Sequence, residues 1–239
     1  MNPERTSRKI QWKELISLLF IMLAVVYLWN TWVVYPLKIL VVFFHELSHG
    51  LMAVITGGSI KEIRIVAAQG GVCVTAGGNR FLTLSAGYLG SLVLGGVILV
   101  LATRTRYDQT IATVIGGLMI LISLLFVRPI ISFGIFFGLL SGLAMIAAGK
   151  YLSEDSNDFI LKVIGLTSCL YAVLDIKSDV LDRPYLRSDA RMLAELTHLP
   201  TIFWGLLWIT IAVIAAVLFL LVACKTRHSK GQGPVDTLR

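Results

Sequence analysis

The chain is a succession of long apolar runs separated by short polar segments. Most of the runs approach the roughly 20 residues that an α-helix needs to cross a bilayer. Apolar runs of this length favour membrane-spanning helices over strands or the core helices of a soluble domain. The pattern predicts helices at residues 15–34, 37–55, 82–102, 111–127, 130–148, 163–174 and 202–224.

Two of these candidates need a further argument. The stretch at 163–174 is short because Lys162 and Asp175 bound it. A lysine side chain can extend to the membrane interface, so we expect Lys162 to lengthen this helix. The first candidate follows a basic stretch, as a signal peptide does, but it has the length of a full span and no cleavage motif follows. We therefore expect an all-α polytopic membrane protein with about six to seven transmembrane helices.

The segment at 57–80, between the second and third candidates, differs from the rest. Residues 59–66 (SIKEIRIV) and 72–75 (VCVT) are β-prone and are separated by Gly70 and Gly71. This pattern predicts a small β-hairpin, with an exposed loop as the alternative. A strand edge at this place would allow an extended substrate to be added as a further strand.

Two other segments carry local signals. The candidate at 82–102 is rich in Gly, Ser and Ala, which let helices approach closely in lipid, so we expect it to pack centrally. The polar segment 177–200 contains Ser188 and Asp189, which are expected to cap a short helix through Leu196. We expect the apolar face of that helix to lie on the membrane surface.

Composition supports a single membrane domain over residues 1–239, with a basic N-tail at 1–13 and a polar C-tail at 225–239. The chain is 56% hydrophobic and only 15% charged, with a mean hydropathy of +0.83. Its net charge of +7 is scattered over short loops and both tails, so nucleic-acid binding is not expected. The distribution of Lys and Arg favours a cytoplasmic N-terminus, although seven spans would then place the basic C-tail outside. Cys73, Cys169 and Cys224 form no CxxC pair and are expected to be free.

The pentapeptide HELSH, at residues 45–49, carries the clearest chemical signal. His45 and His49 are four residues apart, so they share one face of a helix and can bind one metal ion. Glu46 is then placed as a general base toward a water molecule at that metal. With four histidines in the chain, chance produces about two such matches in a thousand sequences. Polar residues that join helices in lipid are the alternative, but ionisable groups at membrane depth usually have a function.

A catalytic metal site of this kind needs a third protein ligand. Asp175 ends an apolar helix and is the carboxylate expected at membrane depth, while Asp179 lies one turn further on the same face and is the alternative. Asp182 and Asp189 are expected in solvent. The remaining histidines lie in a polar loop and in the C-tail, and they are His198 and His228.

Together these features resemble the site-2 protease family of intramembrane zinc metalloproteases. The stretches HELSHG, GGVCV, LSAGYLGS, LYAVLDIKSD and SDARMLAELT resemble its compact, membrane-only branch, which lacks PDZ and CBS modules. The resemblance implies that His45 and His49 bind Zn²⁺ and that Glu46 is the general base. Leu174-Asp175 matches the Leu-Asp of the third-ligand motif, but Ile176 replaces the Gly that commonly follows, which leaves Asp179 open.

We therefore expect a zinc-dependent endopeptidase that hydrolyses peptide bonds in membrane-embedded or membrane-adjacent segments of a membrane-protein substrate. A catalytically silent relative that acts as a scaffold or chaperone is the first alternative, and the intact Glu46 argues against it. A metal or solute transporter is the second alternative. The charged residues form no relay across several spans and no inverted repeat is evident, so this alternative is the weakest.

Overall fold

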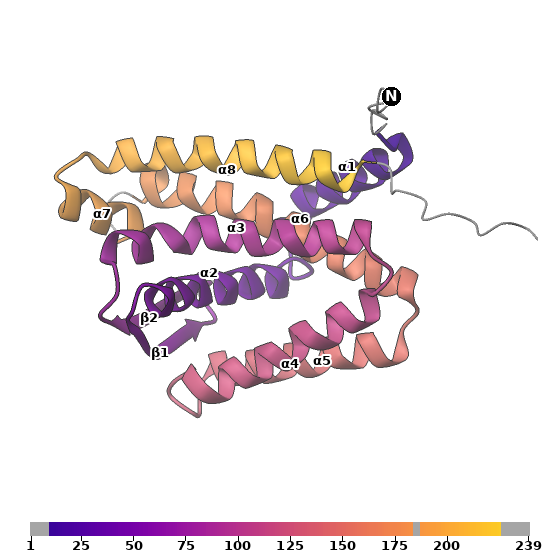
Figure 1. Cartoon of the computed structure of the whole chain (residues 1–239), viewed down its shortest axis with the longest axis horizontal. Helices are drawn as coiled ribbons and strands as arrows, with labels where there is room; N and C mark the ends of the chain where they lie inside the picture. Colours follow the sequence, from indigo (N-terminus) through magenta and orange to yellow (C-terminus); the bar gives the residue numbers. More distant parts are fainter. Residues whose placement is uncertain (1–9, 184–186, 226–239) are drawn as a thin grey trace, which may run out of the picture.

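A computed structural model describes residues 10–183 and 187–225 and confirms an all-α polytopic membrane fold with a small β-hairpin after the HELSH helix (Figure 1). Residues 1–9 of the predicted N-tail and all but the first residue of the predicted C-tail lie outside the described residues. The elements are α1 (Trp12–Tyr27), α2 (Tyr35–Ile55), β1 (Ser59–Val66), β2 (Gly70–Ala76), α3 (Arg80–Arg104), α4 (Asp108–Phe126), α5 (Phe133–Tyr151), α6 (Glu154–Lys177), the π-helical turn η1 (Ser178–Asp182), α7 (Asp189–Thr197) and α8 (Thr201–Ala223).

Within the described ranges, six helices are long and apolar enough to cross a membrane, and α1 is not one of them. Helix α1 has 16 residues and ends at Tyr27, so its length of about 24 Å is less than the hydrocarbon thickness of about 30 Å. The expectation of a full first span at 15–34 is therefore wrong. The backbone N–H of Gln11 donates to the carbonyl of Cys224 at 2.8 Å, so α1 begins beside the end of α8.

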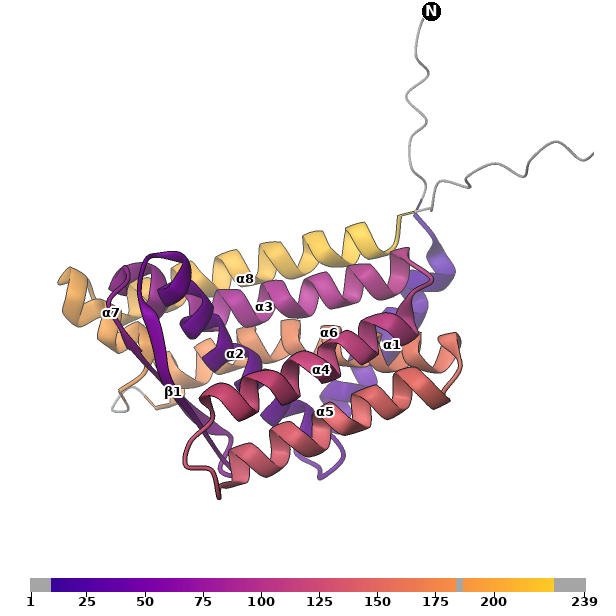
Figure 2. The ribbon, with the colours of Figure 1, turned by 60° about the horizontal axis from the view of Figure 1, so that its bottom comes forward.

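Helix α3 occupies the centre of the bundle, as its small residues predict, and contacts α2, α6, α7 and α8. A Cβ atom added to Gly95 would lie 2.3 Å from Cβ of Ser168 on α6, and one added to Gly90 would lie 2.5 Å from Cβ of Ser48 on α2. These approaches are possible only without a side chain, so the glycines set the distance between the central helices. Figure 2 shows the pair α4 and α5 lying to one side of this group.

Helix α6 is longer than the sequence suggested, with 24 residues that begin after the capping residue Ser153. Lys162 does not extend to an interface, because its Nζ atom lies 2.7 Å from Oε1 of Glu14 and 2.7 Å from Oδ2 of Asp158. Both carboxylates keep the lysine charge inside the bundle, and one of them belongs to α1. The apolar stretch at 163–174 is therefore the middle of a longer helix.

The hairpin prediction is confirmed, since β1 and β2 form an antiparallel pair from Ser59–Ala76 to Val66–Gly70. The outer edge of β1 is partly covered, because Ile63 bridges to Val127 and accepts a backbone hydrogen bond from Arg128 at 2.9 Å. Strand β2 pairs with no other strand in the described part of the chain. Its second edge therefore pairs with no strand there, although the backbone of Cys73 contacts the Glu46 carboxylate.

Helix α7 forms where the capping signal predicts it, and the side chain of Ser188 accepts a hydrogen bond from the backbone N–H of Arg191. The expectation that its apolar face lies on the membrane surface is wrong. Leu193 is fully buried in a cluster that includes Trp204, Trp208 and Tyr88. Helix α7 thus packs its apolar face against α3 and α8, which fixes the position of its first turn.

Candidate metal centre

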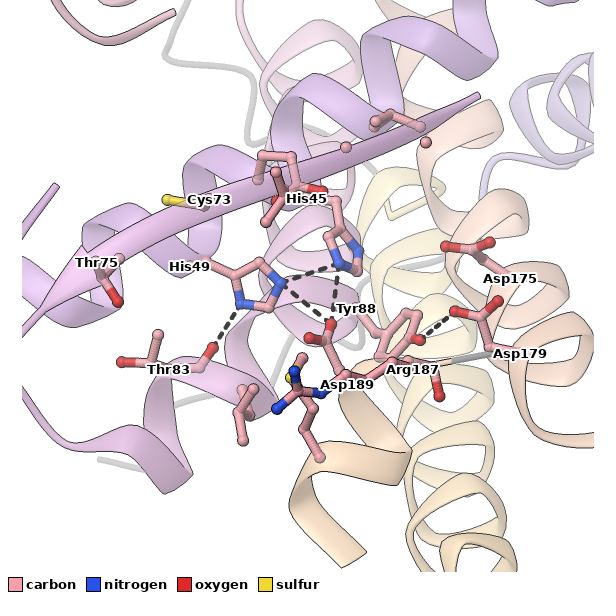
Figure 3. Close-up of a pocket in the computed structure, with 18 of the residues that line it drawn as sticks. His45, His49, Cys73, Thr75, Thr83, Tyr88, Asp175, Asp179, Arg187 and Asp189 are labelled. Atoms are coloured by element: carbon pink, nitrogen blue, oxygen red, sulfur yellow. Dashed lines mark hydrogen bonds and ion pairs between the residues drawn. The ribbon is translucent and has the colours of Figure 1, made fainter. Parts of the chain in front are cut away.

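The HELSH residues of α2 face a cleft of about 730 Å³ that is lined by α2, β2, α3, α6 and the start of α7 (Figure 3). His49 and Glu46 are buried, and His45 is half-buried at the same wall. Because all three lie within one turn of a single helix, the pentapeptide presents two imidazoles and one carboxylate to one cavity. This is the arrangement that the sequence predicts for His45, Glu46 and His49.

Asp189 completes a three-residue cluster with the two histidines. The Nε2 atoms of His45 and His49 are 3.0 Å apart, and Oδ2 of Asp189 lies 3.0 Å from the first and 3.1 Å from the second. Among the described residues, these three form the one group of His, Cys, Asp and Glu side chains whose ligand atoms converge closely enough to hold a metal ion. The cluster joins α2 to α7 across the cleft.

The expectation that Asp189 lies in solvent is wrong, since only 8% of it is exposed. Asp189 is the first residue of α7, directly after the capping Ser188, and the packing of α7 against α3 and α8 turns it toward the histidines. Burial alone would raise the pKa of Asp189, but the charge of His49 and hydrogen bonds with both histidines outweigh it and lower that pKa. The carboxylate is therefore ionised and suited to bind a cation.

Two contacts from α3 orient the histidines. Nδ1 of His49 lies 2.7 Å from the backbone carbonyl of Thr83, which can only accept, so Nδ1 carries the proton and Nε2 faces the cluster. The Tyr88 ring packs edge-on against His45, with centroids 4.9 Å apart. The Tyr88 hydroxyl donates to Asp179 at 2.6 Å, and Arg183 donates to the same carboxylate at 2.9 Å. Sequence reasoning missed Tyr88, whose only signal was its place in the resembling stretch LSAGYLGS.

Two glycines bring neighbouring backbone against the site. A Cβ atom on Gly87 of α3 would lie 2.5 Å from the Nε2 atoms of both His45 and His49. A Cβ atom on Gly71 of β2 would lie 2.5 Å from Oε1 of Glu46. The space in front of the ligand atoms and of the base therefore depends on the absence of a side chain at these positions.

Replacing Gly87 by alanine is expected to displace the two imidazoles and to lower metal affinity by about tenfold or more, because ligand atoms tolerate displacements of only about 0.5 Å. Metal content of the purified variant after dialysis against graded metal concentrations measures this effect. Gly117→Ala on α4 is the matched control, since a Cβ atom there meets nothing within 4 Å. Full metal content in Gly87→Ala would contradict the argument.

Glu46 lies between the histidines and the hairpin, and only 5% of it is exposed. The backbone of Cys73 on β2 is a hydrogen-bond partner of its carboxylate. Burial, followed by the charge of Glu46, raises the pKa of the Cys73 thiol to about 12. The Cys73 thiol is therefore protonated at neutral pH.

The structure brings neither Asp175 nor Asp179 to the histidine pair, although both line the same cleft. Asp179 contacts Tyr88 and Arg183, as described above, and Asp182 is exposed as expected. The ligand role of Asp175 stays a prediction without support from this geometry. His198 is exposed at the end of α7, and His228 lies outside the described residues.

Comparison with known proteins agrees with the membrane-protein fold. A family model described as Peptidase M50B-like matches residues 18–219, which include every helix from α2 to α7 and the three clustered residues. No curated protein and no solved structure gives a significant match to the chain. The family match confirms the resemblance to the site-2 proteases, and the chain therefore belongs to the peptidase M50B-like family.

Proposed function

We propose that this protein is a zinc-dependent intramembrane endopeptidase that hydrolyses peptide bonds in membrane-embedded or membrane-adjacent segments of its substrate. The observation that carries the proposal is the convergence of His45, His49 and Asp189 beside Glu46 in one cleft. Three of the helices that line this cleft, α2, α3 and α6, are candidate membrane spans. Membership of a membrane peptidase family supports the same reaction class.

The donor set fits zinc in kind and in spacing. Zinc binds imidazole nitrogen and carboxylate oxygen at about 2.0 to 2.2 Å in tetrahedral geometry, which separates neighbouring ligand atoms by about 3.3 Å. The three atoms of His45, His49 and Asp189 are 3.0 to 3.1 Å apart, within a few tenths of an ångström of that value. Three protein ligands leave a fourth position for water, as catalytic zinc sites do.

When bound at these residues, zinc lowers the pKa of a water molecule toward about 7 and polarises the carbonyl group that it contacts. Glu46 accepts a proton from the attacking water and later delivers it to the leaving amine. The absence of a side chain at Gly71 lets the β2 backbone approach the Glu46 carboxylate closely. Asp189 and the Thr83 carbonyl hold the histidines in place throughout.

The hairpin supplies a way to present the substrate. A peptide bond in a helix is shielded by its own hydrogen bonds, so the substrate must become extended before attack. The second edge of β2 pairs with no strand in the described chain, and Gly71, Val72 and Cys73 line the cleft, with the Cys73 backbone in contact with the Glu46 carboxylate. An extended segment added to β2 would have its backbone satisfied by the strand and would lie beside Glu46.

Metal removal tests the proposal with the purified protein in detergent and a single-span model substrate. We expect one zinc ion per chain by elemental analysis, cleavage of the substrate, loss of cleavage to background after treatment with 1,10-phenanthroline, and recovery on addition of zinc. The measurements are zinc content and the fraction of substrate cleaved with time.

Two outcomes contradict the proposal in different ways. Cleavage that persists after the metal has been removed would show that the reaction does not depend on the His45, His49 and Asp189 centre. Zinc at full stoichiometry without cleavage, together with stable binding of the uncleaved substrate, would favour the catalytically silent scaffold.

A further inference from the structure

Asp175 is one of two acidic residues of the cleft lining, with Asp179, that the proposed reaction does not use. It lies on α6, in a candidate span, and lines the cleft with His45, Glu46 and Asp189 (Figure 3). Asp179, one turn later, also lines the cleft, and both of its oxygens have partners, in Tyr88 and Arg183. The two aspartates therefore differ in whether their carboxylate oxygens have hydrogen-bond partners.

Asp175 has no side-chain hydrogen bond and no ion pair within the described ranges, whereas Glu14, Asp158, Asp179, Asp182 and Asp189 all contact a cationic side chain. A carboxylate at membrane depth that lacks a partner is costly, and such groups normally have a functional partner. Three exposed guanidinium groups, of Arg80, Arg183 and Arg187, line the same cleft, but Arg183 is paired with Asp179 and water screens the other two. Asp175 is thus an acceptor directed into the cleft.

The position of Asp175 relative to β2 indicates what this partner is. Asp175 belongs to the α6 wall, and the free edge of β2 belongs to the hairpin wall of the same cleft. Successive side chains of an extended segment on β2 point to opposite faces, so alternate side chains of that segment project away from α2 into the cleft. A lysine or arginine at one such position would supply the direct ion pair that no described side chain makes with Asp175.

We propose that Asp175 is a specificity-determining residue that binds a lysine or arginine side chain of the substrate close to the cleaved bond. The inference rests on the proposed function, because it takes the occupant of the cleft to be an extended peptide segment. It gives the substrate a chemical class, namely a membrane-adjacent segment with a basic residue near the site of cleavage.

Peptide binding to the Glu46→Gln variant tests this role without hydrolysis. In a series of otherwise identical peptides, one position at a time carries lysine, glutamine or glutamate, and affinity is measured by fluorescence anisotropy. We expect one position at which lysine binds about tenfold or more tightly than glutamine, with glutamate weakest. Adding Asp175→Asn, which keeps the shape of the side chain, is expected to remove this preference.

Asp182→Asn is the matched control, since Asp182 is exposed, pairs with Lys177 and is outside the cleft lining. It should leave the lysine preference intact. The absence of a preferred position, or a lysine preference that survives in Asp175→Asn, would overturn the proposal. Loss of zinc from Asp175→Asn would also overturn it, because Asp175 would then be a metal ligand. Failure of the wild-type protein to cleave any substrate would count against the proposed function alone, since these affinities are measured without cleavage.

Discussion

Replacing Glu46 by glutamine is expected to reduce peptide hydrolysis by about 10²- to 10⁴-fold while zinc stays bound at full stoichiometry. Glutamine has nearly the same shape as glutamate but cannot accept a proton from water at neutral pH. The proposed ligand atoms belong to His45, His49 and Asp189, so the substitution is expected to leave the metal site unchanged. A loss of rate without a loss of zinc would distinguish a general base from a metal ligand.

The measurement is the initial rate of cleavage of a single-span substrate, with zinc content determined on the same preparation. Glu195→Gln makes the same chemical change on the exposed face of α7, where the side chain is 54% exposed, and it should cleave at the wild-type rate. If Glu46→Gln binds zinc normally and cleaves like the wild type, Glu46 is not the general base.

Much of the fold follows from local patterns in the sequence. The apolar runs identify the six long helices, because each can satisfy its backbone hydrogen bonds within one segment in lipid. The small residues of α3 allow close approach of neighbouring helices, as the structure confirms. The β-prone runs at 59–66 and 72–75 pair as antiparallel strands, as the structure also confirms. The HELSH spacing places His45, Glu46 and His49 on one wall because helical periodicity alone determines it.

The remainder depends on contacts between segments far apart in the chain. The burial of Lys162 within α6 depends in part on its ion pair with Glu14 of α1, a residue far from it in the sequence that no local pattern identifies. Asp189 was assigned to solvent because it lies in a polar segment beside a capping serine. Only the burial of Leu193 against α3 and α8 turns that helix start toward the histidines. Which of Asp175, Asp179 and Asp189 lies beside the histidines therefore depends on tertiary contacts and not on local sequence.

Substitution of Asp189 by asparagine is expected to lower zinc affinity by at least about 100-fold and to abolish hydrolysis with it. An amide is a much weaker ligand for zinc than a carboxylate, and loss of a group that only orients a ligand already costs about 10- to 100-fold in affinity. The substitution leaves the capping Ser188 in place, so α7 should keep its position, which circular dichroism and thermal unfolding would verify.

Comparison of three asparagine variants decides which aspartate completes the centre. Zinc affinity, measured by competition with a chromophoric chelator, should fall in Asp189→Asn and stay at the wild-type value in Asp175→Asn and Asp179→Asn. The exposed Asp182→Asn variant controls for the substitution itself. Zinc loss in Asp175→Asn with retention in Asp189→Asn would restore the ligand role that the Leu-Asp motif implies. The hydrogen bonds between Asp189 and the two histidines would then hold the metal-free cluster together, and the reaction geometry would have to be rebuilt around α6 rather than α7.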